Sequence, residues 1–417
     1  MIDKNIVIVN AHWSNRGDEA ALRAIIDELL RKYKRCKIEV IFKDDRVVTQ
    51  FPYSNVTAFS SKFLPSGFWS LRRAVLKRGK CKEGYNDKMM ESIRKIAEAD
   101  VLVYSPGGAV ICSRFWWKKQ LEYLLPFICA KIYRIPMVVA APSIGPFDGG
   151  ENNYFRNKII RNLLKRVEVL CVREDISRRY LAEIGVNNVI STIDTAFYDM
   201  PDIDKNQKIF EEYKELCNFL ESYDKVIGMT LSDFSWHVKL SNNETLGEKV
   251  HSSMNKFMDV MTQERGVGIL LIPQLFGNQN DYHYLEKYKR NNIFILSDEV
   301  DTYFQQYVIS KLYAVIGMRY HSNIFAAKMG TPFLAIAYEE KMTGFMEKWN
   351  LQKYLIDLHE LSFHKLEKKW VLLETEYREY QNKLNAYREQ WKNEANHTLE
   401  LVTGVIDNML ESELAHS

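Results

Sequence analysis

The chain has 417 residues, of which 46% are hydrophobic and 12% aromatic, and its formal net charge is +3 at pH 7. A chain of this length and composition is typical of an ordered globular protein with about two domains. The charge is too close to neutral for an extended nucleic-acid-binding surface, so we expect no nucleic-acid partner.

The first residues predict a buried strand at 6–9 and have none of the features of a signal peptide. The most apolar long stretch, residues 121–142, contains Lys131 and Arg134 at its centre and two prolines, so it predicts a helix, a turn and a buried strand rather than a membrane span. The six cysteines are scattered without metal-binding spacing, which favours reduced thiols. We therefore expect a cytoplasmic protein without a transmembrane helix, a metal or another cofactor.

The first half of the chain alternates β-type runs with helical patterns, the first of which covers residues 19–33. The predicted strands are residues 6–9, 38–42, 101–104, 137–141, 169–172 and 189–191. This alternation is typical of a mostly parallel sheet covered by helices. We assign residues 1–200 to a first α/β domain.

A polar stretch at residues 199–206 and a charged helix at 207–221 mark the domain boundary, after which the alternation begins again. The later predicted strands are residues 226–230, 268–273, 293–296, 312–316 and 333–337. They define a second α/β domain at 201–360, and two such domains suggest a bilobed enzyme with its site in the cleft. Residues 361–417 predict long amphipathic helices, which either pack across both domains or form an oligomer contact.

Two segments of the first domain combine turn residues with the end of a predicted strand. Asn15, Gly17 and Asp18 precede the first helix, whose free N–H groups favour an anion or a polar ligand. Asp18 either caps that helix or accepts hydrogen bonds from sugar hydroxyls. Gly107 and Gly108 form either a tight turn or a close backbone approach to a ligand, without a dinucleotide or P-loop fingerprint.

Arg173 follows the predicted strand at 169–172 and precedes Glu174 and Asp175. The start of a helix explains the two carboxylates, because negative charge is favourable there, but it does not explain the arginine. Arg173 is therefore a candidate anion ligand.

The most informative segment lies late in the chain, where Arg319 and His321 follow one predicted strand and Lys341 follows the next. If both strands are parallel and share a sheet, the three side chains lie at its carboxyl edge, where open α/β sheets bind ligands. Arginine and lysine bind anions, and histidine exchanges protons near neutral pH. This combination fits a small, doubly charged anion and a proton transfer.

Residue types alone leave an alternative open for the same segment. Arg319 and Lys341 would then form structural ion pairs with Glu339, Glu340 or other carboxylates, and His321 would cap the following helix.

Two further segments, residues 63–82 and 115–119, mix aromatic and basic side chains. Such segments dock on anionic membrane surfaces or stack on sugar rings, but ordinary surface helices have the same composition.

In chain order, these motifs closely resemble the polysaccharide pyruvyl transferase family between residues 6 and 350. The motifs that carry the resemblance are Asn15-x-Gly17-Asp18-Glu19-Ala20, Gly107-Gly108, Ser143-Ile144-Gly145-Pro146, Val172-Arg173-Glu174-x-Ile176-Ser177, Asp194-x-Ala196-Phe197, Gly317-Met318-Arg319-x-His321 and Tyr338-x-x-Lys341. The resemblance implies a GT-B-like fold, in which two Rossmann-like domains face a cleft, followed here by C-terminal helices.

The resemblance also implies an activity, the transfer of pyruvate from phosphoenolpyruvate to two hydroxyls of a sugar as a cyclic ketal, with release of phosphate. The acceptor would be a capsular, exopolysaccharide or cell-wall glycan precursor, lipid-linked at the inner face of the membrane. His321 resembles the general acid of the family, and the residues that resemble its donor ligands are Arg173, Arg319 and Lys341. The candidate acceptor-binding residues are Asn15, Asp18, Gly107 and Gly108. The segment at Gly107 contains fewer glycines than in many relatives, which bears on the choice of acceptor.

Two other functions remain open at this point. A GT-B fold also serves glycosyltransferases that use a nucleotide-sugar donor. A non-catalytic assembly or glycan-binding protein, in which the C-terminal helices matter most, is the second alternative.

Overall fold

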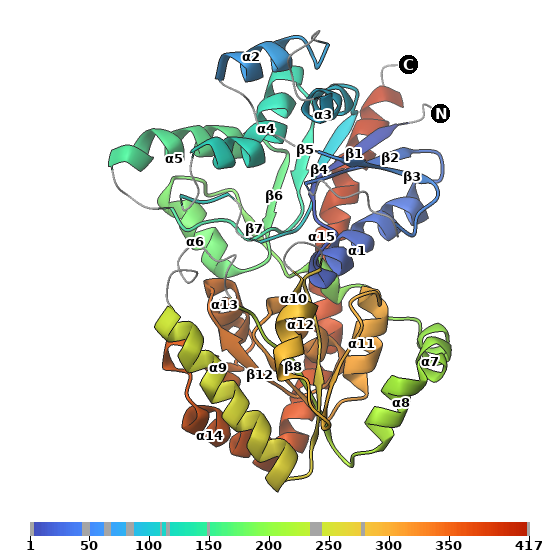
Figure 1. Cartoon of the computed structure of the whole chain (residues 1–417). Helices are drawn as coiled ribbons and strands as arrows, with labels where there is room; N and C mark the ends of the chain where they lie inside the picture. Colours follow the sequence, from blue (N-terminus) through green and yellow to red (C-terminus); the bar gives the residue numbers. More distant parts are fainter. Residues whose placement is uncertain are drawn as a thin grey trace. The chain divides into compact units, whose positions relative to one another are not determined.

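The computed structural model describes residues 4–43, 51–61, 68–80, 87–108, 111–113, 117–147, 151–233, 244–276 and 280–414. The chain forms two compact units (Figure 1). Unit 1 comprises residues 1–13, 21–195 and 394–417, and unit 2 comprises residues 14–20 and 196–393. The change of unit at residues 195–196 lies close to the predicted boundary at 200–201, while the predicted third segment, 361–417, divides between the two units.

Unit 1 is built on a seven-stranded sheet with the order β3-β2-β1-β4-β5-β6-β7, in which all pairs are parallel. Its strands are β1 (Asn5–Ala11), β2 (Lys37–Phe42), β3 (Val56–Ser60), β4 (Val101–Tyr104), β5 (Met137–Val139), β6 (Val169–Val172) and β7 (Ile190–Ser191). The central strands β1 and β4 are almost entirely buried, as expected for a parallel sheet with both faces covered. The predicted α/β architecture of the first half is therefore confirmed.

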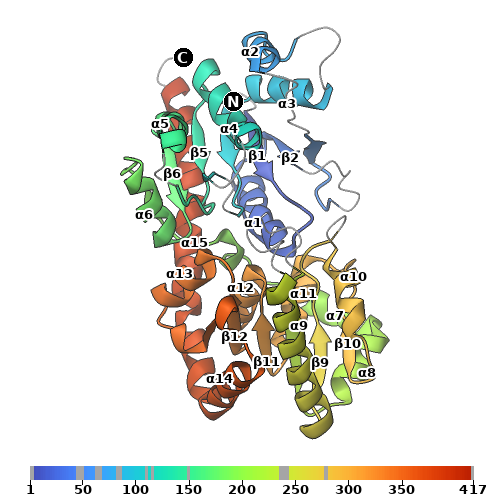
Figure 2. The same cartoon turned by 60° about the vertical axis from the view of Figure 1, so that its left-hand side comes forward.

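The helices of unit 1 are α1 (Arg16–Lys32), α2 (Phe68–Leu76), α3 (Asp87–Ala97), α4 (Trp117–Tyr133), α5 (Glu151–Leu164) and α6 (Asp175–Glu183). Helices α2 to α5 pack in sequence, each against the next, and Figure 2 shows α3 beside α4. They cover a core that includes Leu102, Tyr104, Phe127 and Ile160. The stretch at 121–142 forms most of α4, with Pro126 inside the helix, then a turn and β5, so the predicted helix, turn and buried strand are confirmed.

Unit 2 is built on a six-stranded parallel sheet with the order β10-β9-β8-β11-β12-β13. Its strands are β8 (Val226–Thr230), β9 (Gly268–Leu271), β10 (Ile293–Ile295), β11 (Ala314–Gly317), β12 (Phe333–Ala337) and β13 (Leu355–Asp357). The sequence predicted all of these strands except β13. The four strands β8, β9, β11 and β12 are buried at every position, which makes this sheet the rigid base of the candidate site.

The helices of unit 2 are α7 (Ile203–Glu212), α8 (Lys214–Glu221), α9 (Glu244–Asp259), α10 (Asp281–Leu285), α11 (Thr302–Ser310), α12 (Tyr320–Met329), α13 (Glu340–Lys348) and α14 (Phe363–Thr375). Helices α9 and α14 pack together on one side of the sheet, and α7, α8 and α11 lie on the other (Figure 1). The single helix predicted at 207–221 is in fact the pair α7 and α8. Tyr213 separates them because its ψ of 68° is not helical.

The long helix α15 (Tyr377–Leu414) contributes residues to both units. Within unit 2, its Trp391 packs against Phe197, Phe345 and Trp349. Within unit 1, its Thr403 accepts a hydrogen bond of 3.0 Å from the hydroxyl of Tyr33 at the end of α1. No helix in the described ranges combines the length and hydropathy that a membrane span requires.

Candidate active site

The carboxyl ends of β11 and β12 lie next to each other, because the two strands are parallel and Gly317 pairs with Ala335. Each strand is followed closely by a helix, α12 after β11 and α13 after β12. Arg319 and Glu339 are the N-cap residues of these helices, and neither uses its side chain as a cap. The strand, helix, strand arrangement predicted for this segment is confirmed. It brings two helix N-termini, which favour negative charge, to one edge of the sheet.

Arg319 is buried at this edge and forms an ion pair with Asp281, the first residue of α10. The pair is bidentate: Nε lies 3.2 Å from Oδ2, and Nη2 donates to Oδ1. Burial alone would lower the pKa of Arg319, but the Asp281 carboxylate and the Tyr338 hydroxyl raise it above its ordinary value. Arg319 is therefore a permanent cation whose guanidinium plane is fixed by a carboxylate.

Asp281 is itself held in place by the loop that follows β9. Its Oδ2 accepts backbone N–H bonds from Gln274, at 3.0 Å, and from Leu275, at 2.9 Å. The structural alternative predicted Glu339, Glu340 or another surface carboxylate as the partner of Arg319, whereas the partner is the buried Asp281. Its position inside the short helix α10 carries no local signal, so only the tertiary structure shows it.

Lys341 lies in the first turn of α13 and is held less tightly than Arg319. Its Nζ is 2.7 Å from Oε2 of Glu339 and 5.5 Å from the ring centroid of Tyr320. Burial raises the pKa of Tyr338, while the charges of Arg319 and Lys341 oppose this rise. Both cations therefore lie close to the same phenol, which places them in one cluster. The alternative prediction, in which Lys341 forms a structural ion pair, named Glu339 as a possible partner, and the structure shows this pair.

His321 is the second residue of α12, with only 5% of its surface exposed. Its ring meets the ring of Tyr320 edge to face, at 5.0 Å between centroids. The N-cap of α12 is Arg319, so the alternative in which His321 caps this helix is wrong. The start of the helix is also tied to β8, because Thr230 Oγ1 lies 3.3 Å from the backbone N of Arg319 and 2.8 Å from Oγ of Ser322.

Gly17, in the first turn of α1, packs directly on the imidazole of His321. A Cβ atom added at Gly17 would overlap Cβ, Cγ and Nδ1 of His321. Because the backbone of Gly17 lies this close to the His321 side chain, only glycine, which has no Cβ, fits at this position. Gly17 is therefore not the turn residue that its sequence predicts but a helical residue that contacts the predicted proton donor.

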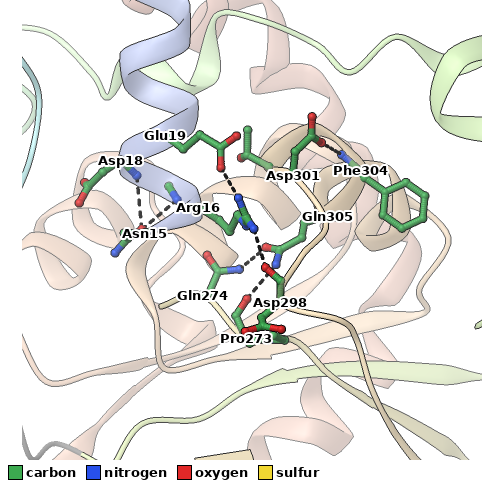
Figure 3. A network of polar contacts seen from close by, with 12 residues as sticks. Asn15, Arg16, Asp18, Glu19, Pro273, Gln274, Asp298, Asp301, Phe304 and Gln305 are labelled. Atoms are coloured by element: carbon green, nitrogen blue, oxygen red, sulfur yellow. Dashed lines mark hydrogen bonds and ion pairs between the residues drawn. The ribbon is translucent and has the colours of Figure 1, made fainter. Parts of the chain in front are cut away.

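The segment that carries Gly17 is anchored to the rest of unit 2 by Arg16, whose contacts Figure 3 shows. The Arg16 guanidinium donates to Glu19 Oε2 and to the carbonyl of Asp298, both at 2.6 Å, and lies 4.0 Å from the ring centroid of Phe276. The backbone N of Arg16 donates to the carbonyl of Gln274 at 3.0 Å. The loop that holds Asp281 thus also holds the segment that packs on His321.

Asn15 and Asp18 lie in the same anchored segment. The Asn15 side chain accepts hydrogen bonds from the backbone N–H of Gly17, at 2.9 Å, and of Asp18, at 3.3 Å (Figure 3). The cap of α1 is therefore provided by Asn15 rather than by Asp18, which corrects the capping alternative for Asp18.

The remaining predicted site residues belong to unit 1, at the carboxyl edge of its sheet. Arg173 follows β6 and is buried, with Nη1 2.6 Å from Asp194 Oδ2, Nε 2.8 Å from Ser143 Oγ and a longer contact of 3.4 Å to Glu174. Arg173 is thus held by a buried carboxylate, as Arg319 is in unit 2.

Gly107 and Gly108 follow β4 at the same edge of unit 1. The carbonyl of Gly107 accepts a bond of 3.1 Å from the backbone N of Ser143, and a Cβ at Gly107 would lie 3.4 Å from Asn10 Nδ2. No atom of the described residues lies within 4 Å of the corresponding position at Gly108. Gly108 therefore has open space beside it, and Gly107 lies close to the end of β1.

Comparisons with solved structures show the fold class. The UDP-GlcNAc 2-epimerase of Neisseria meningitidis has a TM-score of 0.57 at 10% identity, covering 97% of this chain and 100% of that one. A glycosyltransferase from Rickettsia africae has a TM-score of 0.60 at 12% identity, covering 98% of this chain and 99% of that one. At such low identities the likeness concerns the fold alone, which is GT-B-like with two Rossmann-like domains.

Sequence comparison identifies a closer group. The amylovoran biosynthesis protein AmsJ of Erwinia amylovora is 24% identical over 404 residues, which cover 86% of this chain and 89% of that protein. The family described as polysaccharide pyruvyl transferase matches residues 15–340, a range that includes the candidate site residues of both units except Lys341, which follows its last residue. The chain belongs to the polysaccharide pyruvyl transferase family.

Proposed function

We propose that the protein transfers pyruvate from phosphoenolpyruvate to two hydroxyls of a sugar, with formation of a cyclic ketal and release of phosphate. Family membership makes the protein a transferase of polysaccharide biosynthesis. The proposal adds the identity of the donor, phosphoenolpyruvate, and of the product, a cyclic ketal. The observation that carries it is the cluster at the edge of unit 2, where Arg319 and Lys341 lie at two adjacent helix N-termini and His321 is the second residue of the first of these helices.

This cluster contains cations of the kind that the donor requires, each paired with a carboxylate, Asp281 or Glu339. Phosphoenolpyruvate carries a phosphate and a carboxylate, and planar guanidinium groups and lysine bind such anions. In the proposal, Arg319 and Lys341 hold these groups, and Arg173 is a third donor ligand. Asn15, Asp18, Gly107 and Gly108 are the proposed acceptor-binding residues. The acceptor is a saccharide precursor, proposed to be carried by a lipid at the membrane surface.

The proposed reaction starts with a proton transfer from His321 to the methylene carbon of the donor, which makes the central carbon electrophilic. A sugar hydroxyl then forms a C–O bond to that carbon and loses its proton. The bond between the central carbon and the phosphate oxygen breaks, phosphate leaves, and the second hydroxyl closes the ketal with loss of its own proton. A positioned general acid contributes about 10²–10⁴-fold to the rate, and fixed cations stabilise the charge of the leaving phosphate.

Thermal unfolding with and without phosphoenolpyruvate tests the donor site, because a ligand that binds the native state stabilises it by mass action. We expect stabilisation of the wild type and of His321→Ala, but not of Arg319→Ala. The matched control is Arg290→Ala, which removes a different ion-paired arginine of unit 2, bound to Asp259 at 2.6 Å, and should respond like the wild type.

Phosphate release in the presence of sugar acceptors tests the chemistry. His321→Ala should bind the donor and release no phosphate. If the wild type is stabilised by a uridine nucleotide and not by phosphoenolpyruvate, the nucleotide-sugar alternative replaces this proposal. If His321→Ala retains full function in polysaccharide assembly, the protein acts without this catalysis and the proposal fails.

A further inference from the structure

Helix α5 of unit 1 exposes large hydrophobic side chains to solvent. Tyr154 is 63% exposed, Phe155 72% and Ile159 41%. Single exposed hydrophobic residues are common, but three on one short helix form a patch that calls for an apolar partner. In Figure 1 the helix lies at the outer side of its unit, next to α4.

Between its first residue, Glu151, and Glu168 after its end, the same helix and the turn that follows it carry only positive charge. Between residues 152 and 167 the sequence contains five Lys and Arg residues and no Asp or Glu. Of these five, Lys158, Lys165 and Arg166 are exposed. With 3.6 residues per turn, Phe155 and Ile159 share one line along α5 and Lys158 lies on a neighbouring line, while Lys165 and Arg166 follow directly after the helix ends at Leu164. The apolar and cationic side chains therefore occupy one surface, which we call the α5 surface.

A basic cavity adjoins the end of the α5 surface. Its volume is about 390 Å³, and it lies between the ends of α4 and α5 and the starts of β5 and β6. Its lining includes Lys131, Arg134, Lys165 and Arg166, against one carboxylate, Glu168. The cavity opens at the amino ends of these strands, whereas Arg173 and Gly107 lie at the carboxyl ends, so it is separate from the proposed transfer site.

We propose that the α5 surface docks the protein on an anionic lipid bilayer. A basic helix with aromatic side chains lies in the interface of a membrane, with its apolar groups at the boundary between headgroups and acyl chains. Phe155, Tyr154 and Ile159 would enter this boundary, the cations would contact lipid phosphates, and the cavity would hold one anionic headgroup. The apolar side chains favour a bilayer over a soluble polyanion, which offers them no burial.

This inference goes beyond the transfer reaction and does not depend on it. It assigns the membrane contact to α5, whereas the mixture of aromatic and basic residues in the sequence pointed to segments 63–82 and 115–119. Of those segments, residues 63–67, 81–82 and 115–116 lie outside the described residues. A bilayer contact on unit 1 would concentrate the enzyme where a lipid-linked acceptor is found.

Co-sedimentation with vesicles tests the proposal. The purified full chain is mixed with vesicles of phosphatidylcholine alone or of phosphatidylcholine with phosphatidylglycerol. We expect binding to the anionic vesicles that weakens as salt is raised. Lys165→Gln with Arg166→Gln should weaken it about 25-fold, since each cation near an anionic surface contributes about fivefold. Phe155→Ser with Ile159→Ser should weaken it at least tenfold at any salt concentration.

Two matched controls accompany these variants. Arg178→Gln with Arg179→Gln removes two exposed cations from α6, and Ile203→Ser with Ile209→Ser removes two exposed apolar side chains from α7. Both controls should bind vesicles like the wild type. All altered positions are exposed, so thermal unfolding should show intact folds, and phosphate release with a soluble acceptor should not change.

Three results would overturn the proposal. The first is a wild type that does not bind anionic vesicles, and the second is variants of the α5 surface that bind as well as the controls. The third is binding of a soluble polyanion such as heparin that is lost with the lysine and arginine changes and kept with Phe155→Ser and Ile159→Ser, since this would assign the surface to a polyanion.

Discussion

Replacing Gly17 with alanine tests whether the first turn of α1 positions the proposed proton donor. The added Cβ would overlap the imidazole of His321, a contact that no real Cβ makes without a shift of its neighbour. Gly17 lies inside a regular helix and has no left-handed backbone, so alanine would otherwise stabilise it by about 0.5–1 kcal/mol. The whole unfavourable effect would therefore come from the contact with His321.

Neither Gly17 nor His321 can move easily to relieve this contact. His321 is buried and packs beside Tyr320 and Phe325, while the turn that carries Gly17 is anchored through Arg16. Overpacking of this kind costs about 1–3 kcal/mol of stability. A catalytic group displaced by about 1 Å loses about 10²-fold in rate, within the range of about 10²–10⁴-fold for a general acid.

We therefore expect Gly17→Ala to lower the free energy of unfolding by about 1–3 kcal/mol and the rate of phosphate release by about 100-fold or more. Stabilisation by phosphoenolpyruvate should persist, because the change does not touch Arg319 or Lys341. Urea unfolding and a phosphate-release assay measure the two effects. Gly247→Ala in α9 is the control, since no atom of the described residues lies within 4 Å of its Cβ position, and it should keep full stability and rate.

A double variant sharpens this test. With His321→Ala in place, Gly17→Ala should cost little further stability and no further rate, because the clash partner is gone; residues in contact show such non-additive effects. If Gly17→Ala alone matches the wild type in both stability and rate, the packing argument is refuted. If it loses stability but keeps the full rate, then His321 is not the proton donor.

Three further outcomes follow from the charged groups. Asp281→Asn should lower the free energy of unfolding by about 3–5 kcal/mol in urea, because it leaves the buried Arg319 without its counter-charge. Lys341→Ala should change stability by less than about 1 kcal/mol, since its pair with Glu339 is partly exposed, and yet weaken stabilisation by phosphoenolpyruvate in thermal unfolding. Burial alone would raise the pKa of Glu39 in β2, but hydrogen bonds from two lysines and an asparagine hold it below its usual range. Its ionised form therefore stabilises the fold near neutral pH, and this contribution is lost as pH falls through the lowered pKa. Unfolding curves between neutral and acid pH should show a weaker loss of stability for Glu39→Gln than for the wild type.

Local patterns in the sequence predicted the frame of the site. The apolar runs predicted β11 and β12, and Gly330 predicted the end of α12, where its φ of 76° is left-handed and suits glycine. The edge strand β13 was missed because only three residues form it and two of them are exposed or half-buried. Short edge strands have little of the periodicity on which such predictions rest.

Local sequence patterns did not predict the contacts between distant residues that orient the side chains of the site. Asp281 is 38 residues from Arg319 in the sequence. Its neighbours in the sequence are polar and aromatic residues, which do not predict that Asp281 forms an ion pair. Gly17 was marked by its motif, but its role depends on a histidine 304 residues later in the chain. Residue types indicated which side chains could bind an anion or transfer a proton. Tertiary contacts determine which of these side chains have a fixed orientation.

The two cations of the site differ in how they are held, and this difference bears on the choice between ion pairing and ligand binding. Arg319 is fixed by a buried bidentate carboxylate that the loop after β9 orients, so it can present its charge only in one direction. Lys341 pairs with the half-buried Glu339, and exchanging that pair for a ligand phosphate costs little. A buried cation requires a counter-charge whether or not it binds substrate. An ion pair at Arg319 therefore does not argue against donor binding: it sets the orientation of the guanidinium, while the flexible ammonium of Lys341 adapts to the anion.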